Sequence, residues 1–63
     1  MYFRVVIKNR TTFNAADFPY ATALSVSGSN YSITYYDDET LTAPAHTATY
    51  STSDYLVYVV PQN

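Results

Sequence analysis

The segment from Tyr55 to Val60 constrains the fold of this chain more than any other part of the sequence. Its residues are Tyr-Leu-Val-Tyr-Val-Val, and Pro61 ends the run. Because neighbouring side chains of a strand point to opposite faces, a strand here has apolar residues on both faces. Such a strand is either central in a sheet that is covered on both sides, or one of its faces meets a partner.

The chain that must accommodate this strand is short, with 63 residues, so we predict a single domain spanning residues 1–63. A domain of this size buries only about 60% of the surface that its unfolded chain exposes. Small domains therefore usually need a disulfide, a metal or a partner subunit. The sequence has no cysteine and one histidine, His46, which excludes a disulfide and a thiolate or histidine-rich metal site. We predict no metal and no cofactor, which leaves a well-packed aromatic core, a partner chain, or both as the source of stability.

Three further strands are indicated by alternation of apolar and polar residues. The clearest is the N-terminal one, where Phe3, Val5 and Ile7 share one face and the cationic side chains share the other. The weakest is a possible edge strand that begins at His46. These strands comprise residues 2–8, 31–36 and 46–50.

Residues 18–28 allow two structures. In a helix, Asp17 would cap the N-terminus, Pro19 would lie in the first turn, and Gly28 would end the last turn. The apolar stripe of that helix would contain Phe18, Ala21, Leu24 and Ser25.

In a strand, a two-residue turn at Gly28-Ser29 would form a hairpin. That turn would place Leu24 opposite Ile33, and it would form two further pairs on the same face: Val26 with Tyr31 and Thr22 with Tyr35. We predict the helix, because a strand–helix–strand start buries the first strand more easily in a short chain. The expected fold is α+β, a small and mostly antiparallel sheet with one short helix in the order strand-helix-strand-strand-strand. The alternative is an all-β fold of hairpins.

Composition excludes several classes of partner. The net charge is −2, and only 13% of residues are charged, against about 25% in typical domains. The cations are Arg4, Lys8 and Arg10, which are too few to neutralise a nucleic-acid backbone. The apolar run at the N-terminus is far shorter than the roughly 20 residues that cross a membrane, and it does not resemble a signal peptide. We therefore expect no nucleic acid, no membrane and no export.

Catalysis is not expected either. His46 is near Ser51 and Asp54 in sequence, but the chain has no Gly-x-Ser-x-Gly turn and only one glycine. The acidic residues 37–39 have no EF-hand spacing, so they fit a solvated turn better than a calcium site. We predict no catalytic residue and a protein that is not an enzyme.

Most of the eight tyrosines are expected to pack in the core or across strands, but tyrosine combines an apolar body with a polar tip and is enriched at interfaces, so some of them are candidates for protein contacts. Adjacent residues such as Tyr35 and Tyr36 face opposite ways on a strand, so both cannot be buried in a one-sided sheet. The predicted interaction residues are Tyr36, Tyr50, Tyr55, Tyr58 and Val60. Their partner would be a protein, either other copies of the chain or a larger virion or host protein.

A cysteine-free, charge-poor chain that begins with Met and is rich in Thr, Ser, Ala and Tyr resembles, in composition, the small accessory proteins of bacteriophage virions, such as head-decoration or cement proteins. The resemblance implies a structural role as an oligomer or a bound subunit, in the virion or the host cytoplasm. The alternative is a small phage-encoded inhibitor that binds a host enzyme or defence complex through a sheet edge or the turn around Asp38.

Overall fold

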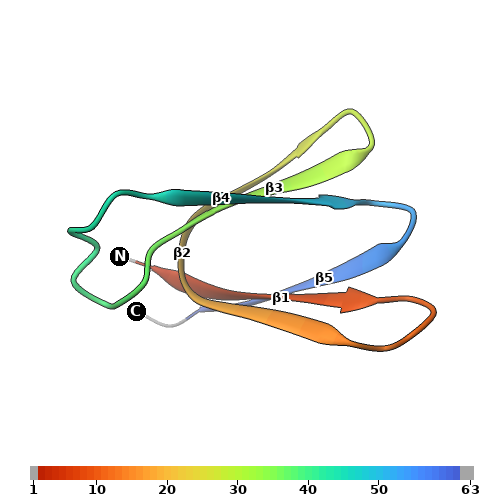
Figure 1. Cartoon of the computed structure of the whole chain (residues 1–63), viewed down its shortest axis with the longest axis horizontal. Helices are drawn as coiled ribbons and strands as arrows, with labels where there is room; N and C mark the ends of the chain where they lie inside the picture. Colours follow the sequence, from red (N-terminus) through yellow and green to blue (C-terminus); the bar gives the residue numbers. More distant parts are fainter. Residues whose placement is uncertain (1, 62–63) are drawn as a thin grey trace.

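A computed structural model describes residues 2–61, and every regular element in it is a β-strand. The strands form one antiparallel sheet in the order β4-β3-β2-β1-β5. The sheet curls strongly, so that β3 and β4 lie above β1 and β5 with β2 bending between them (Figure 1). The strand bounds are β1 Phe3–Asn9, β2 Ala15–Ser27, β3 Asn30–Tyr35, β4 His46–Ser51 and β5 Tyr55–Pro61.

The helix expected over residues 18–28, and with it the α+β fold class, is wrong. These residues lie in β2 and in the turn that follows it, and Asp17 is part of the strand rather than a helix cap. The all-β alternative fits. The hairpin turn at Gly28-Ser29 and the pairs of Leu24 with Ile33 and Val26 with Tyr31 are confirmed. The expected pair of Thr22 with Tyr35 is wrong, because the register shifts between Ala21 and Ala23 and Tyr35 pairs with Ala21 instead. Gly28 has a φ of 61°, a conformation that costs glycine no side-chain clash.

Two β-bulges explain why β2 imitates a helix in sequence. Between the pairs Phe3–Ala21 and Val5–Phe18, β1 advances by two residues while β2 advances by three. Pro19 falls within this bulge, which is one of the few places where a sheet tolerates proline. The ladder to β3 has a second irregularity between Ala21 and Ala23.

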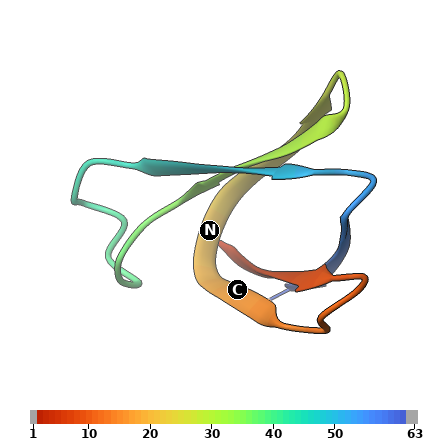
Figure 2. The ribbon, with the colours of Figure 1, turned by 45° about the vertical axis from the view of Figure 1, so that its right-hand side comes forward.

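Each bulge adds one residue to β2 and so changes which side chains point inward. Phe18, Ala21 and Leu24 are consequently three residues apart, yet all belong to the core or pack against it. A spacing of three is the spacing of a helical stripe, so the sequence pattern was real but its cause was a bent strand. The bend lets β2 extend along both halves of the curled sheet (Figure 2).

The core lies on the concave face of the sheet. Its fully buried members are Val5, Ile7, Ala21 and Ile33. Aromatic side chains surround them, including the tilted pair of Phe18 and Tyr35, whose ring centroids are 4.7 Å apart. The fold therefore has one small core with half-buried side chains around it, and about half of the described residues are exposed.

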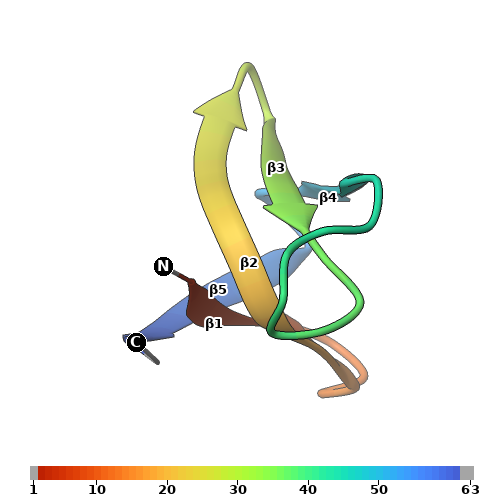
Figure 3. The same cartoon turned by 90° about the vertical axis from the view of Figure 1, so that its left-hand side faces the viewer.

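Strands β4 and β5 are consecutive in the chain but lie at opposite ends of the strand order. Residues 52–54 connect them across the curled sheet (Figure 1), and Figure 3 shows β4 above β5 with β2 extending over both levels. Backbone hydrogen bonds hold this turn, from Thr52 N to Ser29 O at 2.8 Å and from Arg10 N to Asp54 O at 2.8 Å. No ladder joins β4 to β5 among the described residues, so each has one unpaired edge.

Candidate interaction surface on strand β5

Strand β5 is a regular strand at the edge of the sheet, and the option of a central position is wrong. All seven residues of Tyr55–Pro61 pair with β1 without a register shift. The sequence favours this geometry because valine and tyrosine fit a pleated surface. Since β5 is last in the strand order, its other edge carries backbone groups that no strand of the described chain pairs.

The inner face of β5 is only partly covered. Val57 pairs with Ile7 and Val59 pairs with Val5, so both valines point toward the core. Val5 is fully buried, whereas its partner Val59 is 50% exposed. The difference arises because β1 has strands on both sides, while β5 has none beyond it.

The outer face of β5 is exposed as well. Tyr58 is 50% exposed and pairs with Val6, and Val60 is 48% exposed and pairs with Arg4. Consecutive residues of β5 thus expose apolar surface on both faces of the same strand. We call Tyr58, Val59 and Val60, together with the unpaired edge of β5, the β5 surface.

Cations lie beside the β5 surface but not on it. Arg4 and Lys8 are on the outer face of β1, and Lys8 pairs with Leu56 of β5. Arg4 Nε is 3.4 Å from Asp17 Oδ1 without the geometry of a hydrogen bond. Lys8 Nζ lies 5.6 Å from the centre of the Phe13 ring. Strand β5 itself has no charged residue.

The other predicted interaction residues lie apart from Tyr58 and Val60. Tyr55 begins β5 but packs against Tyr50 of β4, with ring centroids 4.9 Å apart. Tyr36 follows the end of β3 and donates its backbone N–H to Tyr20 O at 2.9 Å. Sequence reasoning did not include Val59, which the apolar pattern on both faces of β5 could have indicated.

Asp38 lies in the loop between β3 and β4, where it accepts hydrogen bonds from the backbone N–H and the hydroxyl of Thr40. The side-chain bond is the largest cause that lowers the pKa of Asp38, and the backbone bond adds to it. In the same loop Asp37 pairs with His46 Nε2 at 3.1 Å. Two carboxylates of this acidic turn are therefore engaged within the chain.

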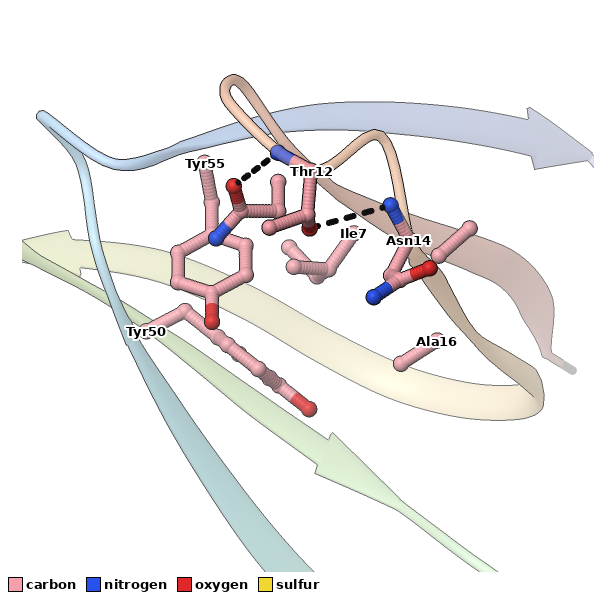
Figure 4. A pocket seen from close by; sticks show the side chains of 8 residues that line it. Ile7, Thr12, Asn14, Ala16, Tyr50 and Tyr55 are labelled. Carbon is pink, nitrogen blue, oxygen red and sulfur yellow. Dashed lines mark hydrogen bonds between the residues drawn. The ribbon is translucent and has the colours of Figure 1, made fainter.

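A small cavity lies at the end of the sheet where the β1–β2 loop approaches the aromatic pair of Tyr50 and Tyr55 (Figure 4). Its volume is about 210 Å³, below the range of roughly 300–1,000 Å³ that is usual for small-molecule sites. Burial raises the pKa of Tyr50, and the neighbouring Tyr55 and Tyr35 add to the rise. The lining residues are uncharged and include Ile7, Thr12, Asn14, Ala16, Tyr50 and Tyr55.

The groups that could be combined on paper into a catalytic set lie far apart. His46 and Ser51 are at opposite ends of β4, about 17 Å apart at 3.4 Å per residue. Ser51 Oγ instead hydrogen-bonds Ser53 Oγ at 2.9 Å. Residues 2–61 contain no cluster of three or more side chains that could ligate a metal. The described part of the chain also has no helix that could span a bilayer.

Comparison with known proteins finds no match: no protein-family model fits the sequence, and no curated protein and no solved structure is similar to it.

Proposed function

We propose that this chain is a non-enzymatic interaction protein that acts as a subunit of a larger protein assembly, with the β5 surface as its contact site. The observation that carries the proposal is the exposure of three consecutive apolar residues, Tyr58, Val59 and Val60, on an edge strand whose outer backbone groups pair with no other strand of residues 2–61.

The energy available at this site is substantial for a chain of this size. Complete burial of a large apolar side chain is worth about 1.5–3 kcal/mol, so covering each half-exposed residue gives roughly 1 kcal/mol. A partner strand at the edge would add backbone hydrogen bonds to this gain, as in other complexes formed by strand addition. A partner thus supplies what a domain with four fully buried core residues lacks.

The compositional resemblance to bacteriophage decoration and cement proteins supports a structural role for the assembly, in a virion or in the host cytoplasm. The acidic turn is a weaker candidate for the contact site, because the carboxylate of Asp37 already pairs with His46 and that of Asp38 already accepts a hydrogen bond from Thr40. The proposal therefore places the partner at β5 rather than at residues 37–39.

Site-specific photo-crosslinking tests this proposal, because it captures whichever protein contacts the chosen position. Benzoylphenylalanine replaces Tyr58 in one variant and Thr47 in a matched control, since Thr47 is also an exposed strand residue but lies on β4. In cells that make the protein, we expect a discrete protein adduct from position 58 and none from position 47. Absence of an adduct at position 58, or equal adducts at both positions, would refute β5 as the contact site.

A further inference from the structure

We propose that the occupant of the β5 surface is a second copy of this chain, whose own β5 adds antiparallel to the first across a two-fold axis at Tyr58. The inference rests on the proposed function, because it requires that the β5 surface contacts protein. It goes further by naming the partner and the register of pairing.

The first step concerns the edge itself. Soluble proteins usually block an exposed edge strand with a charged side chain, a proline or a bulge. From Tyr55 to Val60, β5 has none of these, and its ladder to β1 is regular throughout. Pro61 stands only at the end of the strand. The edge therefore has the uninterrupted geometry that a partner strand needs.

The second step concerns the side chains that meet. Two identical strands that pair antiparallel form a closed, self-complementary interface. Tyr58 is the middle residue of the seven in β5, so an axis there pairs the whole strand. Val57 then lies opposite the partner's Val59 on the inner face, and Leu56 lies opposite the partner's Val60 on the outer face. Every pair is apolar or aromatic.

The third step concerns charge. Lys8 and Arg4 of β1 pair with Leu56 and Val60 of β5, so they are the nearest cations to the axis. In the paired sheet, Lys8 of one copy and Arg4 of the other are separated by three strand spacings, or about 14 Å. That distance exceeds the screening length of about 8 Å at physiological salt. Like charges therefore do not oppose the pairing.

The other edge of the sheet offers a poorer match. Strand β4 exposes Thr47 and Thr49 on its outer face. If β5 paired with the β4 of a second copy, these polar threonines would face the tyrosine and valine side chains of β5. A β5–β4 contact is also head-to-tail and would propagate into an open fibre. The β5–β5 contact closes after two copies, pairs the free edges, and brings the apolar side chains of both faces into cross-strand contact.

Engineered disulfides test the register directly, because the chain has no cysteine of its own. Residues that face each other in an antiparallel pair have Cα atoms about 4.5–5.5 Å apart, which suits a disulfide. Tyr58→Cys should therefore form a disulfide-linked dimer. The matched control is Leu56→Cys, whose two copies would lie about 14 Å apart in this register, four residues along the strand.

We expect Tyr58→Cys to cross-link at least ten times faster than Leu56→Cys under mild oxidation. A mixture of Leu56→Cys and Val60→Cys should form the mixed dimer, and this pair keeps the test valid if Tyr58→Cys does not fold. The wild-type chain should have a mass of about 14.2 kDa by light scattering, twice the 7.1 kDa of one copy.

Equal cross-linking of Tyr58→Cys and Leu56→Cys, or a wild-type chain that stays monomeric at its solubility limit, would overturn the self-pairing. An adduct from position 58 to a different protein, with no adduct to a second copy, would overturn it as well. None of these results refutes the proposed function, because the photo-crosslink at position 58 captures any protein that contacts β5 and tests that function separately.

Discussion

Val5 and Val59 are identical residues that face each other across the β1–β5 ladder, yet one is fully buried and the other is half exposed. Replacing each with alanine therefore measures how open the β5 edge is in a single copy. Because the same side chain is truncated in both variants, the difference in cost reports the surroundings of each valine, its burial above all.

The expected costs differ by about 2 kcal/mol. At Val5, the two lost methyl groups forfeit about 1.6 kcal/mol of transfer energy. The cavity left behind, roughly 50 Å³, adds about 1.2 kcal/mol. At Val59, the transfer loss is about half as large, near 0.8 kcal/mol, and solvent fills the space. A domain of 63 residues has a total stability of roughly 3–9 kcal/mol, so Val5→Ala consumes a large share of it.

Urea unfolding followed by tyrosine fluorescence measures both costs, at a dilution where light scattering shows the monomer. With a slope of about 1 kcal/mol per molar urea, we expect the midpoint to fall by 2–3 M for Val5→Ala and by less than 1 M for Val59→Ala. Equal costs at high values would show that Val59 is covered within one copy, which would refute the open edge. Equal costs at low values would show that Val5 is not in the core.

Three further predictions concern single groups. The Tyr50 phenol should titrate above its usual pKa of 10.0 in a spectrophotometric titration at alkaline pH. Because the folded state favours the neutral phenol, the contribution of Tyr50 to stability is complete below pH 10 and is lost as the pH rises through the folded pKa. Thr40→Val should bring the lowered pKa of Asp38 back toward 3.8 in an NMR titration, and an unchanged Asp38 titration in the variant would contradict the assigned cause. In the wild type, this carboxylate contributes stability above pH 3.8 that is lost as the pH falls through the folded pKa. Phe13→Gly should raise the free energy of unfolding by up to about 1 kcal/mol, because Phe13 has a φ of 64° that strains a residue with a side chain. A loss of stability in urea unfolding would mean that the contact of Phe13 with Lys8 outweighs the strain.

Much of the fold could be predicted because four of its strands follow simple local rules. Alternation located β1, β3 and β4, a continuous apolar run located β5, and Gly28 marked the turn of the β2–β3 hairpin. The failure at β2 has a physical origin, since two bulges replaced the period of two with a spacing of three at Phe18, Ala21 and Leu24. A local pattern does not distinguish a bulged strand from a short helix when both place apolar residues three apart.

The candidate site was accessible to sequence reasoning only in part. The apolar residues on both faces of β5 singled out Tyr58 and Val60, and both are about half exposed in the structure. The edge position of β5 depends on its pairing with β1, a contact between the two ends of the chain that no local pattern contains. Tyr50 packs beside Phe18, with ring centroids 6.1 Å apart, only because the sheet curls. The spacing of three in β2 is the local trace of this bend, but it does not show which distant strands the bend brings together.

The ladder between β1 and β5 also governs the order in which a newly made chain can complete its fold. Phe3 pairs with Pro61, 58 positions later in the sequence, so β1 is without one of its neighbours until β5 has been synthesised. Until then β1 presents an open edge beside Val5 and Ile7, and the β5 of an adjacent nascent chain has the sequence that fits it. Exchange of β5 between chains is therefore a hazard wherever many copies are translated close together, and the turn at residues 52–54, which ties the two ends of the sheet to each other, favours closure within one chain.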